Sequence, residues 1–231
     1  MLHPGSGVYF LVRSQGKLCR TVRYRLSSRA GGAQATAASG HYLLFEAVGE
    51  IHYGNPSTFF YDMFADRSSL ARALTLRAND GVTEVIYLAT HGDENAIGPG
   101  ASVSISRTEF RNDFVAANAK GKVKGLFLGT CLTGNLSTAK FLLTGGAKLE
   151  WVAGYRQSVD WIDGSAIDMI FCHKLAAEYR ANAKRKRGKL TSLQMAHKAA
   201  SELAKLVPGA HAIYGFNIYF LNGTNVNCMY V

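Results

Sequence analysis

TEVIYLAT at residues 83–90 and GLFLGT at residues 125–130 are the two stretches that decide the fold of this chain. Each is a short, nearly continuous apolar run, which is the pattern of a strand buried on both faces of a parallel sheet. The first runs into His91-Gly92 and the second runs into Cys131. Helix signals follow both strands, so strand and helix alternate through the middle of the chain. This alternation predicts an α/β fold whose central sheet is mostly parallel and carries helices on both faces.

The segments around these two strands complete the predicted fold. Two strands at 8–13 and 18–26 form a hairpin, and further strands are expected at 41–48, 149–155, 212–221 and 225–230. Helices are expected at about 55–78, 107–119, 135–143, 163–183 and 191–206, and three of them start at Ser106, at Asn135 and at Asp163 or Gly164. Because we see no repeat and no linker, we expect residues 1–231 to form one domain, with residues 1–40 as a basic N-terminal hairpin and loop extension.

Composition excludes several classes of protein. The chain has 231 residues, of which 48% are hydrophobic and 18% are charged, so it can bury a core and is not disordered. No stretch approaches the roughly 18 apolar residues of a membrane helix. The N-terminus lacks the pattern of a secretion signal. We therefore expect a cytoplasmic protein that has no membrane partner.

The four cysteines are too few for a disulfide scaffold and stand at no metal-binding spacing: Cys19, Cys131, Cys172 and Cys228. We expect neither a metal ion nor any other cofactor. In a reducing cytoplasm, a cysteine thiol stays free for chemistry. Cys172-His173 lies inside an apolar helical stretch, and we interpret it as core or helix surface.

Basic residues outnumber acidic residues by 26 to 16, which gives the chain a net charge of +10. Residues 1–45 contain no acidic residue, and a second basic cluster lies at 184–189. Such clusters can bind nucleic acid or another polyanion. No aromatic RNA motif and no zinc-finger spacing accompanies them, so we favour a solubilising surface and do not expect a nucleic-acid partner.

The chemistry of the protein is expected where the two deciding strands end. Sites in open α/β sheets form at the carboxyl ends of parallel strands, so neighbouring strands would bring His91 and Cys131 together. A thiolate attacks a carbonyl carbon, and an imidazolium protonates the leaving amine. The helix expected from Asn135 would stabilise the thiolate with its N-terminus. Alone, such a cysteine is more often a buried apolar residue and a His-Gly pair is more often a turn, but together they favour a catalytic pair.

YLATHG followed by LFLGTCLTG, with His91 and Cys131 40 residues apart, resembles the caspase-like cysteine peptidases of clan CD, and most closely the bacterial CHAT proteins. The resemblance covers about residues 41–180 and implies a three-layer caspase-like fold. It also implies a dyad of His91 and Cys131 with Gly92 at the oxyanion position. The Cys131 N–H would be the second donor of the oxyanion hole, as its place in the same turn indicates. The segment from Cys131 to Trp151 is too short for the cleavable linker of caspases, so we expect no processing there.

The resemblance further places the pocket for P1, the substrate residue before the scissile bond, between residues 155 and 165. Asp160 in this segment would select arginine or lysine, whereas Arg156 would select an acidic residue. Asp163 is a weaker rival, because a role as helix N-cap explains it well. Arg156 can turn to solvent, so we expect cleavage after a basic residue. The loop at 184–187 is then a candidate site of self-cleavage.

The leading interpretation is a thiol protease that acts as an endopeptidase on a protein or peptide substrate. One alternative is a catalytically idle caspase-like module that binds other proteins. Another is a basic protein that binds nucleic acid or a polyphosphate, which requires the basic clusters at 13–29 and 184–189 to share one face. A peptidase of this kind must be restrained, so an activating partner protein or a polyanionic ligand is a further expectation.

Overall fold

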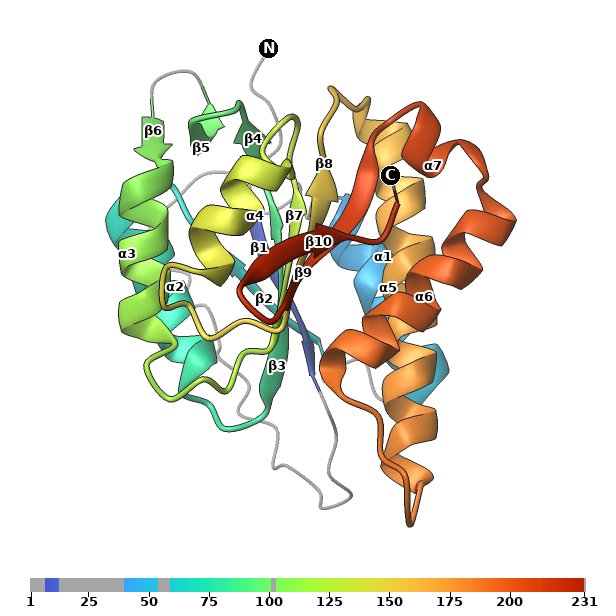
Figure 1. Cartoon of the computed structure of the whole chain (residues 1–231). Helices are drawn as coiled ribbons and strands as arrows, with labels where there is room; N and C mark the ends of the chain where they lie inside the picture. The colour runs from blue at the N-terminus through green and yellow to red at the C-terminus, as the bar shows by residue number, and fades with distance from the viewer. Residues whose placement is uncertain (1–6, 13–39, 54–58, 101–102, 231) are drawn as a thin grey trace, which may run out of the picture.

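The computed structural model of the protein describes residues 7–12, 40–53, 59–100 and 103–230. A seven-stranded mixed sheet runs through it in the order β10-β9-β8-β7-β3-β1-β2 (Figure 1). In chain order, its strands are β1 (Gly7–Val12), β2 (Phe59–Met63), β3 (Thr83–Ala89), β7 (Gly125–Gly129), β8 (Trp151–Tyr155), β9 (Phe216–Asn222) and β10 (Asn225–Cys228). A small second sheet consists of β4 (His91–Gly92), β5 (Ala96–Gly100) and β6 (Val103–Ser106).

Helices cover both faces of the large sheet, which confirms the predicted α/β fold (Figure 1). One face carries α2 (Arg67–Ala78), α3 (Arg107–Ala117) and α4 (Leu136–Leu143). The other carries α1 (Gly40–Tyr53), α5 (Trp161–Lys184) and α6 (Ser192–Leu206), and the short α7 (Gly209–Ala212) follows α6. Ser106 caps α3 and Asn135 caps α4 through their side-chain oxygens, as predicted.

The two deciding strands are buried on both faces because their side chains alternate between two cores. Ile86 and Leu88 of β3 pack into the core beneath α2, α3 and α4. Val85, Tyr87 and Ala89 of the same strand pack into the core beneath α1, α5 and α6. In β7, Leu126 and Leu128 pack into the first core and Phe127 packs into the second. Two apolar cores therefore explain why both strands are nearly continuous apolar runs.

Only the centre of the large sheet is parallel. β3 pairs with β7 and β7 pairs with β8 in parallel, while the other four neighbouring pairs are antiparallel. The prediction of a mostly parallel sheet is therefore wrong for the sheet as a whole. At one edge, β9 and β10 are joined by a tight turn at Gly223, whose φ is +63°, and a hairpin can only be antiparallel.

β1 is an inner strand of the large sheet and not part of a separate extension. It lies between β3 and β2 and is antiparallel to both. Its expected hairpin partner at 18–26 lies outside the described residues. The partners of β1 come from positions far along the chain, and a local hydrophobic pattern does not reveal them.

The strand expected at 41–48 is wrong, because these residues belong to α1. Phe45, Val48 and His52 are buried, and their separations of three and four residues match one face of a helix. A short apolar run does not distinguish a buried strand from a buried helix, and this is why the sequence predicts a strand here.

The helix expected at about 55–78 is also wrong at its start, because β2 precedes α2. Asp66 caps α2: its carboxylate accepts the N–H of Ser69, and the Ser69 hydroxyl accepts the N–H of Asp66. This capping box lies inside the expected helix and marks the true start. Leu70 and Leu74 then bury one face of the helix, as predicted. Residues 54–58 lie outside the described residues.

Two histidines join α1 to α5. His52 Nε2 lies 2.8 Å from His173 Nδ1, so one ring donates a hydrogen bond to the other. Burial lowers the pKa of both rings, and the positive charges of His173, Arg180 and Lys174 lower the pKa of His52 further. Protonation of both rings would remove the only acceptor in this contact, so the folded pair favours the neutral state.

We expect the His52–His173 pair to lower the free energy of unfolding as the pH drops from about 7 to about 5. Unfolded histidines take up protons near pH 6.5, whereas the folded pair with its lowered pKa values does not, so acid favours the unfolded chain. Thermal unfolding measured across this pH range gives the slope of the free energy of unfolding against pH. His173→Gln should make the slope smaller, and His211→Gln, which removes a histidine outside this contact, serves as the control. Equal slopes in wild type and His173→Gln would contradict the prediction.

Candidate active site

A pocket lies at the carboxyl ends of β3 and β7, which is where the sequence predicts the chemistry of the protein to lie. Ala89 of β3 and Gly129 of β7 are paired in parallel register. His91 and Cys131 each follow two residues after one member of this pair, so both lie at the same edge of the sheet. Both residues line a pocket with about 370 Å³ of empty space, including the part that is open to solvent. The structure thus brings together the two residues that the sequence places in the dyad.

Gly92 brings the His91 segment into contact with the Cys131 loop. His91 and Gly92 form β4, which pairs with β5. A Cβ atom built on Gly92 would lie 2.3 Å from Thr133 Oγ1 and 3.1 Å from the Cys131 carbonyl oxygen. A residue with a side chain does not fit there without a shift. The glycine therefore allows the backbones of both segments to approach closely.

The backbone after Cys131 is strained and is tied to the segment around β8. Leu132 has a φ of +60°, a left-handed conformation that costs a non-glycine residue about 1–2 kcal/mol. Its N–H donates to the Gln157 carbonyl at 3.2 Å, and the N–H of Gly134 donates to the Tyr155 carbonyl at 3.0 Å. Such strain persists only where the surroundings fix it, and it clusters at functional sites.

The Cys131 sulfur faces the backbone just before α5. The Val159 N–H points at Sγ from 3.4 Å, and the Ser158 hydroxyl lies 3.9 Å from it. Sγ also lies 3.5 Å from the Val159 carbonyl oxygen, which the neutral thiol can reach as a donor. The N–H and hydroxyl donors would stabilise a thiolate at this position.

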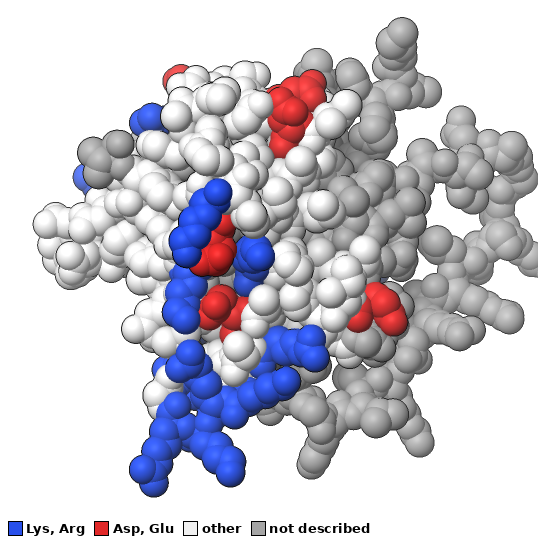
Figure 2. Space-filling model, turned by 90° about the vertical axis from the view of Figure 1, so that its right-hand side faces the viewer, with Lys and Arg blue, Asp and Glu red and all other residues white. Residues whose placement is uncertain are grey.

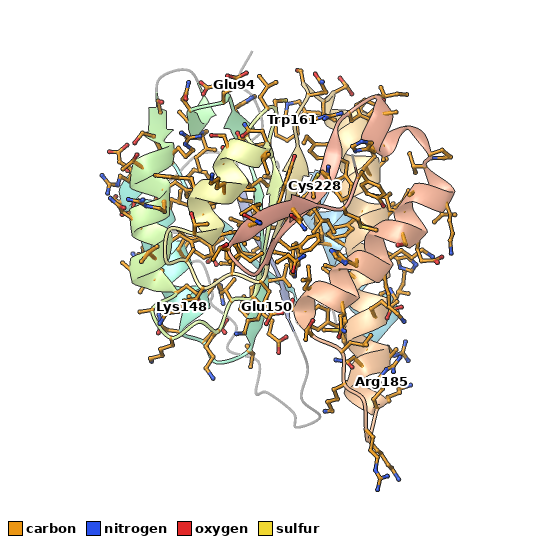
Figure 3. All side chains as sticks on the ribbon, viewed as in Figure 1. Glu94, Lys148, Glu150, Trp161, Arg185 and Cys228 are labelled. Carbon is orange, nitrogen blue, oxygen red and sulfur yellow. The ribbon has the colours of Figure 1, made fainter. Side chains whose placement is uncertain are left out.

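His91 packs against Trp161, the first residue of α5. The two ring centroids are 5.5 Å apart, and the ring planes stand at 87° to each other. Trp161 is 42% exposed and lies at the same end of the molecule as Glu94, which follows β4 (Figure 3). This edge-on contact covers one side of the imidazole and limits its rotation. Sequence reasoning did not single out Trp161 as part of the site.

Asp160 lies at the edge of the pocket, where it caps α5. Its carboxylate accepts the N–H of Ile162 at 2.8 Å, and its side chain is exposed. Because Asp160 is the cap, α5 begins at Trp161, and the expected start at Asp163 or Gly164 is wrong. Asp160 therefore lines the pocket, but its carboxylate is already hydrogen-bonded to the first turn of α5.

The other two candidates for the specificity pocket do not line it. The Asp163 carboxylate accepts a hydrogen bond from the Tyr214 hydroxyl. The exposed Arg156 side chain packs over Gly215, whose Cβ would lie 2.1 Å from Arg156 Cγ. Both side chains are engaged outside the pocket, so neither is placed to contact a substrate within it.

A buried carboxylate lines the pocket, and sequence reasoning missed it. Asp168 is 3% exposed and accepts hydrogen bonds from the hydroxyls of Tyr155, at 2.5 Å, and of Tyr87. Burial raises the pKa of Asp168 to about 7, although both phenol hydrogen bonds act to lower it. Burial also raises the pKa of both tyrosines, so they remain donors. The signal that could have revealed it is an acidic residue within the apolar stretch 166–172 (AIDMIFC).

Thr130 contributes a second feature that sequence reasoning missed. Its side chain is 3% exposed and lines the pocket, and Oγ1 has no hydrogen-bond partner among the described residues. A buried hydroxyl without a partner costs about 1–3 kcal/mol. A buried hydroxyl without a partner calls for an explanation, and a ligand bound in the adjoining pocket would provide one.

Comparison with known proteins gives no family assignment. No family model, no curated protein and no solved structure matches the chain. In the part of the chain that the structure describes, no group of three or more His, Cys, Asp or Glu side chains is placed to hold a metal ion. None of the described helices has the length and apolar character needed to span a membrane. Any assignment of function therefore rests on the chemistry of the pocket.

Proposed function

We propose that the protein is a caspase-like cysteine endopeptidase, with Cys131 as the nucleophile and His91 as the general acid and base. One observation carries the proposal: His91 and Cys131 line the same pocket at the carboxyl ends of adjacent parallel strands. The three-layer arrangement and the His-Gly and Cys segments at these strand ends agree with the resemblance to the caspase-like peptidases.

In the proposed reaction, the Cys131 thiolate attacks the carbonyl carbon of the scissile peptide bond. The N–H groups of Gly92 and Cys131 stabilise the oxyanion that forms. The imidazolium of His91 then protonates the leaving amine, which leaves a thioester and a neutral imidazole. The imidazole takes a proton from water, and the resulting attack on the thioester releases the acid and restores the thiolate–imidazolium pair.

A polyanion is the proposed activating ligand, because basic side chains gather at one end of the molecule (Figure 2). Lys184, Arg185, Lys186, Arg187 and Lys189 are all exposed. The other basic cluster, at 13–29, lies outside the described residues. The length of α5 separates the basic end from the pocket, so a polyanion bound there would leave the pocket open to substrate.

The proposed function is tested by the rate at which iodoacetamide alkylates each cysteine of the full chain. We expect Cys131 to react far faster than Cys228, which is also half-buried, and faster than the buried Cys172. Burial raises the pKa of Cys172, so this thiol gives the slow reference. His91→Ala should slow the alkylation of Cys131 and leave Cys228 unchanged.

The same samples distinguish a peptidase from a catalytically idle module. Hydrolysis of a panel of fluorogenic peptides should fall in proportion to the fraction of Cys131 that is alkylated. If Cys131 reacts no faster than Cys228 and no peptide of the panel is cleaved, the proposed function is wrong.

A further inference from the structure

The pocket is acidic among the described residues that line it. Asp160 lies at its edge and Asp168 is buried in its wall, and no lysine or arginine is among these lining residues. A cationic side chain loses its hydration when it enters a pocket, and a nearby negative charge offsets this cost. The charge of the pocket therefore favours a cationic ligand over an anionic one.

The Asp168 carboxylate is held by two tyrosines in a fixed position. Tyr87 comes from β3 and Tyr155 from β8, and each hydroxyl donates to a different oxygen of the carboxylate. Gly129 allows this arrangement, because a Cβ atom there would lie 2.6 Å from the Tyr87 hydroxyl. Each carboxylate oxygen can accept a second hydrogen bond, so the group keeps capacity for a ligand.

The Thr130 hydroxyl is an independent sign of a ligand. Thr130 directly precedes Cys131, is nine-tenths or more buried, and carries a hydroxyl oxygen without a partner among the described residues. Thr138 carries another such hydroxyl, but it does not line the pocket. An N–H donor entering the pocket would satisfy Thr130 Oγ1 and remove the cost of its burial.

We propose that Asp168 and Thr130 form the floor of the P1 subsite and bind the guanidinium or ammonium group of a substrate arginine or lysine. Asp168 supplies the counter-charge, and Thr130 Oγ1 accepts one N–H. This inference rests on the proposed function, since it places P1 next to the nucleophile Cys131. It assigns the basic preference to a buried residue of α5 and not to Asp160, whose carboxylate caps the helix.

The test measures binding without chemistry. Two tripeptide amides that differ only in ending with arginine or with citrulline, its neutral isostere, are titrated calorimetrically into the full-length Cys131→Ala variant. We expect the arginine peptide to bind at least about tenfold more tightly, because hydrogen bonds to charged groups are the stronger ones. Asp168→Asn and Thr130→Val, each added to Cys131→Ala, should remove most of this difference. Thr138→Val, which removes the other buried hydroxyl without a partner, should leave it unchanged.

Equal binding of the two peptides would overturn the inference, and so would a difference that survives in both Asp168→Asn and Thr130→Val. If Asp168→Asn does not fold, Thr130→Val decides alone, because removing a buried hydroxyl that has no partner is not expected to destabilise the fold. The proposed function fails separately, through unaccelerated alkylation of Cys131 and absent hydrolysis. The peptide titration still gives its answer in that case.

Discussion

Cys131→Ala and His91→Ala will each lower peptide hydrolysis by several orders of magnitude. The first removes the nucleophile and with it the covalent route, and the second removes the group that protonates the leaving amine. Because the two residues act as a unit, the double variant should be scarcely slower than either single variant. Single-turnover and steady-state rates on one fluorogenic peptide measure all three variants.

Cys228→Ala is the matched control for these variants, since Cys228 is also a half-buried cysteine but lies in β10, away from the pocket. It should keep the wild-type rate. Melting temperatures of all variants show whether the fold is intact. A folded Cys131→Ala variant that still hydrolyses the peptide would remove the basis of the assignment.

Gly92→Ala will lower kcat by about two orders of magnitude, the effect expected for the loss of one oxyanion donor. The added Cβ would lie 2.3 Å from Thr133 Oγ1 and 3.1 Å from both the Cys131 carbonyl oxygen and Thr130 Cβ. To relieve these contacts, the Gly92 backbone and its N–H must move away from the Cys131 loop. The variant should therefore lose kcat even where the rest of the fold is retained.

Thr133→Ala offers a rescue of Gly92→Ala. It removes the closest of the three contacts, so the double variant should recover part of the lost kcat. Thr133→Ala alone is the control, because it also removes a hydroxyl that lies 3.0 Å from the Asp93 carbonyl oxygen. Wild-type kcat in Gly92→Ala would show that the close approach of the two backbones is not needed for catalysis.

Local signals were sufficient for the central elements of the fold. The apolar runs of β3 and β7 are buried on both faces, and Ser106 and Asn135 stand at helix starts where a side-chain oxygen serves the free N–H groups. Elements whose place depends on distant partners were not predictable in this way. β1 lies between β3 and β2, although α1 separates it from both along the chain. The apolar run within α1 is short, and only the residues that follow it reveal the length of a helix.

The same distinction holds within the candidate site. That His91 and Cys131 line one pocket was predictable, because each follows an apolar run and neighbouring parallel strands end at the same edge of a sheet. Asp168 was not, because its burial depends on Tyr87, which is 81 residues away in the chain, and on Tyr155. A hydrophobic pattern shows that a helix is buried, but it does not show which tyrosines meet an acidic residue on it.

The length of α5 decides how the basic loop can be processed. α5 begins at Trp161 beside the pocket and ends at Lys184 after 24 residues, a span of about 36 Å at 1.5 Å per residue. Trp161 and Arg185 accordingly lie at opposite ends of the molecule (Figure 3). A rigid helix thus keeps the expected self-cleavage site at 184–187 out of reach of the pocket in its own molecule. Any cleavage there would have to be intermolecular, so its rate would rise with the square of the protein concentration and would be lowest in dilute protein.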